Sequence, residues 1–199
     1  MNHCEHGIAC GLYCIRCCLV VARSQRYRVL VADPPWPFKD ALPGEGRGAV
    51  KHYDLMSVKE IMRYPQPAMF NDSLLFLWRV ASMQQEALDV IDAWDFQLKS
   101  EIVWKKLTKH GKRFFGMGRT VRMEHETCLI ATSGRPNILD SSIRSIFEAP
   151  VGRHSEKPEK FYRIVEQLTA GPYIELFARR QREGWTCIED TRHASTLRG

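Results

Sequence analysis

The 199-residue sequence lacks several features that would each point to a particular class of protein. It contains no internal repeat and no low-complexity tract, which excludes solenoid, fibrous and disordered chains. Its longest apolar stretch, from Ile8 to Ala22, is interrupted by Arg16 and follows no basic leader, so it predicts neither a transmembrane helix nor a secretory signal. We therefore expect a cytoplasmic protein with no membrane partner.

The sequence also has no G-x-G-x-x-G loop, the fingerprint that grips the phosphates of dinucleotides. What it does have is an ordinary globular composition, with 44% hydrophobic and 26% charged residues. Its formal charge of +6 is a modest basic excess, which suits a polyanionic partner. A chain of this length can hold one α/β domain and a small appendage.

Cysteine is abundant and unevenly placed, because five of the seven cysteines fall in the first 18 positions. In a reducing compartment such a cluster indicates thiols or a metal site more than disulfides. Four residues form a C-x-H-x7-C-x2-C pattern that suits a structural zinc ion. They are Cys4, His6, Cys14 and Cys17, with Cys10 as an alternative fourth ligand. The alternative interpretation is that these cysteines are free thiols.

From residue 25 onward, short apolar strands alternate with amphipathic helices. Strands are expected at 27–32, 73–79, 96–105, 125–132, 173–178 and 185–188, and helices at 57–64, 82–94 and 159–168. This alternation predicts an α/β fold with a mostly parallel, doubly wound sheet and helices on both faces. We divide the chain into a Cys-rich segment (1–24), an α/β domain (25–192) and a tail (193–199).

The first strand runs into Asp33-Pro34-Pro35-Trp36, at the sheet edge where ligands bind in such folds. A carboxylate and a proline-held carbonyl are two rigid hydrogen-bond acceptors, and we expect no donor to compete for the carbonyl of Pro34. Such acceptors suit the exocyclic amine of adenine, whose lone pair must leave conjugation before it can attack. Trp36 would offer a flat face to an unstacked base. The alternative is a strand-ending turn with a buried tryptophan.

The tetrapeptide belongs to a series of short motifs spread from about Arg26 to Thr191. The others are LLFLW at 74–78, IVWK at 102–105, GMGR at 116–119, HE at 125–126, SEKP at 155–158, ELFAR at 175–179 and GW at 184–185. In this order they resemble the MT-A type of adenine N6-methyltransferases, the family of the mRNA adenosine methyltransferases and their bacterial and phage relatives. The resemblance implies a Rossmann-like, S-adenosylmethionine-dependent methyltransferase fold in a permuted order, with the catalytic tetrapeptide first and the cofactor strand last.

The same resemblance implies roles for individual residues. The catalytic residues would be Asp33, Pro34, Pro35 and Trp36, and the cofactor-binding residues would be Asp33, Lys157, Glu175, Arg179 and Asp190. Lys157 would approach the methionyl carboxylate, and Glu175 and Arg179 would line the ribose and adenine side. Asp190 stands where relatives have asparagine, so it would bring a negative charge to the ribose. A cofactor without a phosphate agrees with the missing glycine-rich loop.

The segment between the third and fourth expected strands is basic and contains Phe114 and Phe115. Basic residues interleaved with aromatic ones suit phosphate contacts combined with base stacking. The candidate nucleic-acid contacts are Lys105, Lys112, Arg113, Arg119 and Arg122. The alternative is a solvated charged loop. His125 and Glu126 are expected to organise the sheet edge near the site and not to act as acid and base.

The resemblance predicts methyl transfer to the N6 amine of adenine in DNA, as in the bacterial and phage branch of the family. RNA adenosine is the first alternative, since the chemistry is identical. A second alternative is a catalytically silent, nucleic-acid-binding partner subunit, although such subunits lose the tetrapeptide that is intact here. Protein glutamine is a third acceptor, which Trp36 in place of tyrosine disfavours. Whether the chain forms a homodimer or a heterodimer stays open.

Overall fold

The computed structural model describes residues 25–37, 55–116, 120–152 and 156–189. The four zinc candidates, Arg119 and Asp190 lie outside the described residues, as do the Cys-rich segment and the tail. The strands are β1 (Tyr27–Ala32), β2 (Met69–Arg79), β3 (Gln97–Leu107), β4 (His125–Ser133), β5 (Ile146–Pro150), β6 (Tyr173–Ala178) and β7 (Trp185–Glu189). The helices are α2 (Val58–Met62), α3 (Gln84–Ala93) and α4 (Glu159–Leu168).

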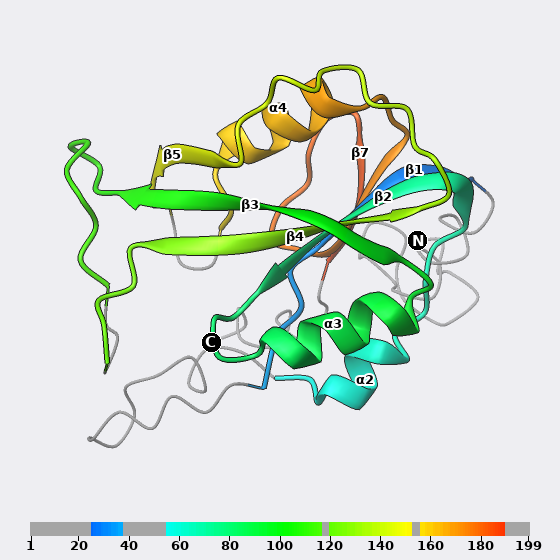
Figure 1. Cartoon of the computed structure of the whole chain (residues 1–199), viewed down its shortest axis with the longest axis horizontal. Helices are drawn as coiled ribbons and strands as arrows, with labels where there is room; N and C mark the ends of the chain where they lie inside the picture. Colours follow the sequence, from blue (N-terminus) through cyan, green and yellow to red (C-terminus); the bar gives the residue numbers. More distant parts are fainter. Residues whose placement is uncertain (1–24, 38–54, 117–119, 153–155, 190–199) are drawn as a thin grey trace, which may run out of the picture.

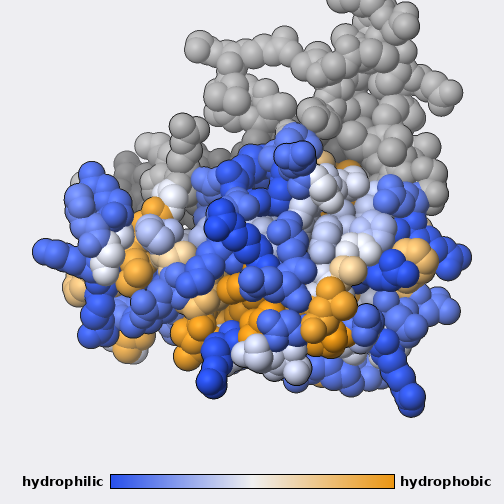
Figure 2. All heavy atoms as spheres, turned by 90° about the horizontal axis from the view of Figure 1, so that it is seen from above, coloured by the Kyte–Doolittle hydropathy of each residue, from blue (hydrophilic) through white to orange (hydrophobic). Residues whose placement is uncertain are grey.

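The seven strands form one sheet in the order β5-β3-β4-β2-β1-β6-β7. Helix α4 covers one face, and α2 and α3 cover the other (Figure 1). This arrangement confirms the α/β sheet with helices on both faces. On the α4 side the molecular surface is mostly hydrophilic, with small apolar patches between charged side chains (Figure 2).

Both faces of the central strands are buried because the middle of each strand is a nearly unbroken apolar run. In β1, Val29 and Val31 pack into the core beneath α4, whereas Leu30 and Ala32 pack into the core beneath α2 and α3. Side chains alternate across a strand, so one continuous apolar run supplies both cores. The expected strand at 27–32 is confirmed residue for residue.

Strand β1 lies between β2 and β6 and is parallel to both. The chain continues from β1 to one side of the sheet and later returns to the other side with β6 and β7, so a topological switch point lies between β1 and β6. In open α/β sheets, ligands bind at such a point beyond the carboxyl ends of the strands. Asp33 directly follows β1 and therefore lies at this point.

The sheet is mostly parallel, as predicted, and two of its features were not foreseen. Strand β4 is antiparallel to both β2 and β3, and the described part of the connection between β3 and β4 contains no helix. The short edge strand β5 was missed; it pairs in parallel with β3. Its five residues alternate between exposed and buried and end in Pro150, a pattern that an irregular loop can share.

Within the described residues, every helix is too short or too polar to span a bilayer. The same residues contain no group of three or more histidine, cysteine or acidic side chains placed to hold a metal ion.

Candidate functional site

A cavity of about 480 Å³ opens where β1, β2 and β6 end and β4 begins. Its lining is Asp33, Pro34, Pro35, Trp36, Leu55, Trp78, Arg79, Val80, Ala81, Lys106, Met123, His125, Glu126, Thr127, Lys157 and Arg179. The structure thus brings the predicted tetrapeptide together with two of the predicted cofactor residues, Lys157 and Arg179. Small-molecule sites in proteins have volumes of roughly 300–1,000 Å³, so the cavity has the size of a ligand site.

Lys157 links two carboxylates in the wall of this cavity. Its ammonium nitrogen lies 2.7 Å from Oδ2 of Asp33 and 3.2 Å from Oε2 of Glu126. Glu126 also pairs with Lys106, at 2.5 Å. Only 9% of the Lys157 side chain is exposed, so the charge is stabilised by these partners and not by water.

The linked charges change each other's pKa. Burial favours the neutral form of Lys157, but the neighbouring Asp33 and Glu126 outweigh this effect and raise the pKa of the amine above its usual range. Burial likewise opposes the charge on Glu126, yet Lys157 and Lys106 lower the pKa of that carboxyl to about 2. At neutral pH the cavity wall therefore presents fixed charges of both signs.

Two backbone hydrogen bonds hold the tetrapeptide in place, and one of them corrects an expectation. The amide of Trp36 donates to the carbonyl of Pro34 at 2.8 Å, so that carbonyl is not free of competing donors as expected. A carbonyl oxygen has two lone pairs, and one remains for a ligand. The amide of Met56 donates to the carbonyl of Pro35 at 2.9 Å, which ties the tetrapeptide to the segment before α2.

Trp36 is a wall of the cavity and also part of the core. Its side chain is 3% exposed, and its indole N–H donates to the carbonyl of Trp78 at 2.9 Å. The ring is therefore fixed, and only a small part of it can meet a ligand. Trp78 was missed as a site residue; its ring lies 5.0 Å from the ammonium of Lys157, within cation–π range.

Arg179 reaches the cavity from a distorted end of β6. The β6–β7 register shifts between Leu176 and Ala178, and the intervening Phe177 has a φ of 61°. Such a φ is strained for a bulky side chain, and strain of this kind gathers at functional sites. A bulge re-aims the residues that follow it, which places Arg179 among the lining residues.

Glu175 lies in the buried layer and not among the residues that line this cavity. Its carboxylate accepts a 2.7 Å hydrogen bond from Tyr162 of α4, and Arg182 lies 3.5 Å from the centre of the tyrosine ring. Burial raises the pKa of Glu175 to about 7. Contact between Glu175 and a cofactor stays a prediction. Tyr162 and Arg182 were not foreseen, because only the fold brings them to this carboxylate.

The candidate nucleic-acid residues differ in the contacts that they make within the chain. Lys105 pairs with Glu148 at 2.7 Å, and Arg113 pairs with Glu124 at 2.9 Å. Lys112 is exposed. Arg122 lies over the ring of Phe115, at 4.9 Å from its centre. Two of the predicted cations therefore already have a carboxylate partner within the chain.

Glu126 is the site residue whose role the sequence left least defined. It reaches the cavity because β4 is antiparallel, so that the first residues of β4 lie beside the last residues of β2 and β3. Arg79 pairs in register with Thr127, and Trp104 pairs with Glu126. A parallel β4 would place Glu126 at the opposite edge of the sheet. The signal in the sequence is the connection 108–124, which is predicted to contain no helix and therefore favours a hairpin.

Comparison with known proteins agrees with this geometry. The sequence profile of the MT-A70 family matches residues 27–191. The N(6)-adenosine-methyltransferase MT-A70-like protein of Drosophila melanogaster is 32% identical over 159 residues, which are 77% of this chain and 24% of that protein. The human N(6)-adenosine-methyltransferase catalytic subunit METTL3 is 30% identical over 172 residues, which are 82% of this chain and 28% of that protein.

A further human relative, the N(6)-adenine-specific methyltransferase METTL4, is 24% identical over 176 residues, or 80% of this chain and 36% of that protein. The chain thus spans between 24% and 36% of the length of these relatives. The profile match covers β1 to β7 and every described residue of the cavity wall. The chain therefore belongs to the MT-A70 family.

Proposed function

We propose that this chain transfers a methyl group from S-adenosylmethionine to the N6 amine of adenine in DNA. The observation that carries the proposal is the ion pair between Asp33 and Lys157, in the wall of a cavity formed by the D-P-P-W tetrapeptide. Two of the three relatives are named for adenosine, which is the ribonucleoside, and one is named for adenine. We choose DNA on the resemblance to the DNA-modifying branch, and RNA adenosine is the alternative.

The residues of the cavity fit this cofactor. Lys157 carries a positive charge at any working pH and can meet the cofactor's carboxylate, while Asp33 can meet its amino group. Arg179 lines the same cavity and adds hydrogen-bond donors. When bound, S-adenosylmethionine supplies a methyl group activated by a sulfonium centre.

In the reaction that we propose, Asp33 and Pro34 orient the adenine amine. Lys157 occupies Oδ2 of Asp33 and fixes the carboxylate, so we assign Oδ1 and the remaining lone pair of the Pro34 carbonyl to the two amine hydrogens. Held this way, the nitrogen lone pair turns out of conjugation toward the methyl carbon. The N–C bond forms as the C–S bond breaks, its electron pair stays on sulfur, and a proton then leaves the nitrogen for solvent. The acceptors stabilise the positive charge that develops on nitrogen.

The silent-partner alternative is less well supported. A subunit that only binds nucleic acid has no need of a rigid acceptor pair or of a buried lysine that carries a charge into the cavity. Buried charges are costly, and they occur where a function or a partner requires them. Here the charge of Lys157 adjoins both the tetrapeptide and the cavity.

The test is methyl transfer from labelled cofactor to DNA and RNA oligonucleotides of the same sequence. Asp33→Ala should reduce transfer by at least roughly 100-fold, since removal of one transition-state contact of this kind typically has that effect. Asp92→Ala, an exposed carboxylate on α3, is the matched control and should keep wild-type activity. Wild-type turnover by Asp33→Ala would refute the mechanism. Cofactor or oligonucleotide binding without label on either polymer would favour the silent partner.

A further inference from the structure

Phe115, in the connection between β3 and β4, has an unusually exposed aromatic ring. It is 70% exposed, more than any other large apolar side chain among the described residues. The guanidinium of Arg122 lies 4.9 Å from the centre of its ring. An aromatic ring and a guanidinium held together in solvent form a flat surface that carries a positive charge.

The neighbouring residues hold this surface in place. Arg113 makes two-pronged hydrogen bonds to Glu124, at 2.9 to 3.1 Å, and a β-bridge pairs Arg113 with Leu107. The amide of Phe114 donates to the carbonyl of Lys106 at 3.3 Å, and the Phe114 ring lies 5.6 Å from the Lys106 ammonium. Phe114 is therefore half-buried beside Lys106, whereas Phe115 points to solvent.

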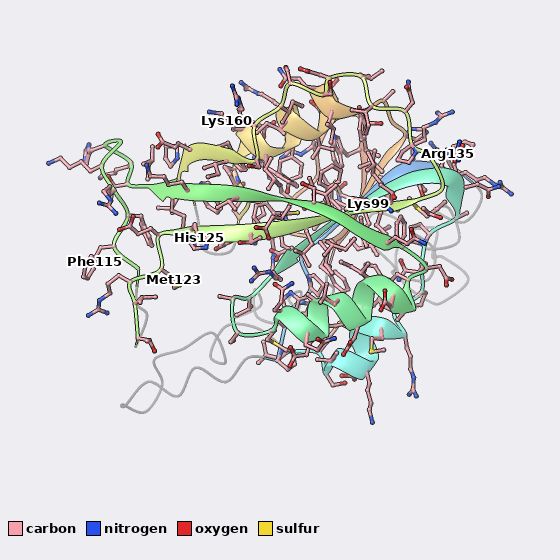
Figure 3. The ribbon with its side chains drawn as sticks, in the orientation of Figure 1. Lys99, Phe115, Met123, His125, Arg135 and Lys160 are labelled. Atoms are coloured by element: carbon pink, nitrogen blue, oxygen red, sulfur yellow. The ribbon has the colours of Figure 1, made fainter. Side chains whose placement is uncertain are left out.

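Gly116 connects the exposed ring to the cavity. Its backbone packs so closely on Met123 that a Cβ at Gly116 would overlap the carbonyl oxygen of Met123. Met123 is itself part of the cavity wall. Phe115 and Met123, on the connection that extends beyond β3 and β4, lie at the same end of the molecule as His125, the first residue of β4 (Figure 3). The exposed ring is thus next in sequence to a residue that touches the wall of the cavity.

We propose that Phe115 and Arg122 form a stacking platform for a base that flanks the target adenine in an unpaired nucleic-acid strand. This inference rests on the proposed function. An adenine whose N6 amine enters a cavity must leave its stack, and its neighbours lose a stacking partner. An exposed aromatic ring replaces that partner for any base, and an arginine beside it attracts the phosphates. Lys109 and Lys112, both exposed on the same connection, add positive charge.

The experiment is a double-mutant cycle, in which the Phe115 ring is removed from the protein, a flanking base is removed from the strand, or both are removed together. Labelled single strands with one adenine each, in DNA and in RNA, are prepared with an abasic site at successive positions on either side of the adenine. Dissociation constants of the full chain are measured by fluorescence anisotropy. The variants are Phe115→Ala, Phe115→Trp and, as an exposed apolar control on another loop, Leu139→Ala, whose side chain is 57% exposed.

For wild type, an abasic site at one flanking position should weaken binding roughly 5- to 100-fold, the usual effect of losing one stacked base. Phe115→Ala should weaken binding of the intact strand by a similar factor and should be insensitive to that abasic site. Phe115→Trp should restore the sensitivity, and Leu139→Ala should behave as wild type. Thermal unfolding of each variant checks that the fold is retained.

Equal sensitivity of wild type and Phe115→Ala at every position would overturn the platform. If wild type still methylates the adenine in that case, the proposed function stands without it. Failure of wild type to bind any strand would also overturn the platform and would point to a protein partner for this surface. The methyl-transfer assay reports on the proposed function separately.

Discussion

Replacement of Lys157 by methionine removes a buried charge and keeps a linear side chain of similar size. Asp33 and Glu126 are then left in the cavity wall without the ammonium that lies 2.7 and 3.2 Å from them. Removing one member of a buried ion pair typically destabilises a protein by about 3–5 kcal/mol. The pKa shift of Glu126 gives a similar loss in the free energy of unfolding, because a fall in pKa from 4.5 to about 2 corresponds to roughly 3 kcal/mol.

Two features reduce the destabilisation expected for Lys157→Met. Glu126 is 32% exposed, so solvent screens part of the interaction. Lys106 also stays paired with Glu126 in the variant. We therefore expect Lys157→Met to lower the free energy of unfolding by about 3 kcal/mol at pH 7, a large share of the 5–15 kcal/mol that is typical of a whole domain.

The loss should depend on pH in a defined direction. The folded-state pKa of Glu126 lies below its unfolded value, so its contribution to stability is present above pH 4.5 and is lost as the pH falls toward 2. In the variant, Lys106 alone pairs with Glu126, so the contribution that acid can remove is smaller there than in wild type. The difference between wild type and variant should therefore stay level from pH 7 to about pH 4.5 and shrink from there to pH 3.

Urea unfolding followed by circular dichroism at several pH values measures both quantities. Lys160→Gln, an exposed lysine on α4, is the matched control and should change the free energy of unfolding by less than about 0.5 kcal/mol. A loss below about 1 kcal/mol at pH 7, or a loss that stays constant from pH 7 to pH 3, would refute the assignment of a stabilising buried ion pair.

Two further substitutions test other parts of the structure. The folded-state pKa of Glu175 is raised from 4.5 to about 7, so wild type should lose up to roughly 3 kcal/mol of stability as the pH rises through this interval. Urea unfolding of Glu175→Gln should show no such dependence on pH. The same pH dependence in wild type and variant would contradict the argument that burial raises this pKa. Gly116→Ala should cost about 1–3 kcal/mol of stability and weaken oligonucleotide binding, because its Cβ overlaps the carbonyl of Met123. Wild-type melting and affinity in that variant would show that the close contact at Gly116 does not hold the platform.

The sequence predicts the elements best where both faces of a strand are covered. The runs in β1 and β6 are apolar apart from Arg28 and Glu175 and are sharply bounded, so their bounds agree with the expectation. Strand β5 could not be predicted in this way, because it is a short edge strand with only two buried residues, Phe147 and Ala149. Its identity as a strand depends on pairing with β3, which local sequence does not encode.

In the candidate site, too, some features follow from the sequence and others depend on the fold. The position of Asp33 follows from the sequence, because a buried strand stopped by two prolines must end at that residue. The hydrogen bond from Trp36 to Pro34 could not be foreseen from the residue types, since it depends on the backbone path after the strand. The strained φ of Phe177, and with it the direction of Arg179, likewise depends on a bulge against β7.

The sequence by itself determined the apolar strands, the tetrapeptide at the end of the first strand and the resemblance to a family, because these depend on the order of residue types along the chain. Only the tertiary structure decided which charges meet. Asp33 and Lys157 are 124 positions apart, and Glu126 joins them only because β4 runs antiparallel. Charge partners depend on distance and burial in the folded chain, and these are set when the strands pair and the helices pack.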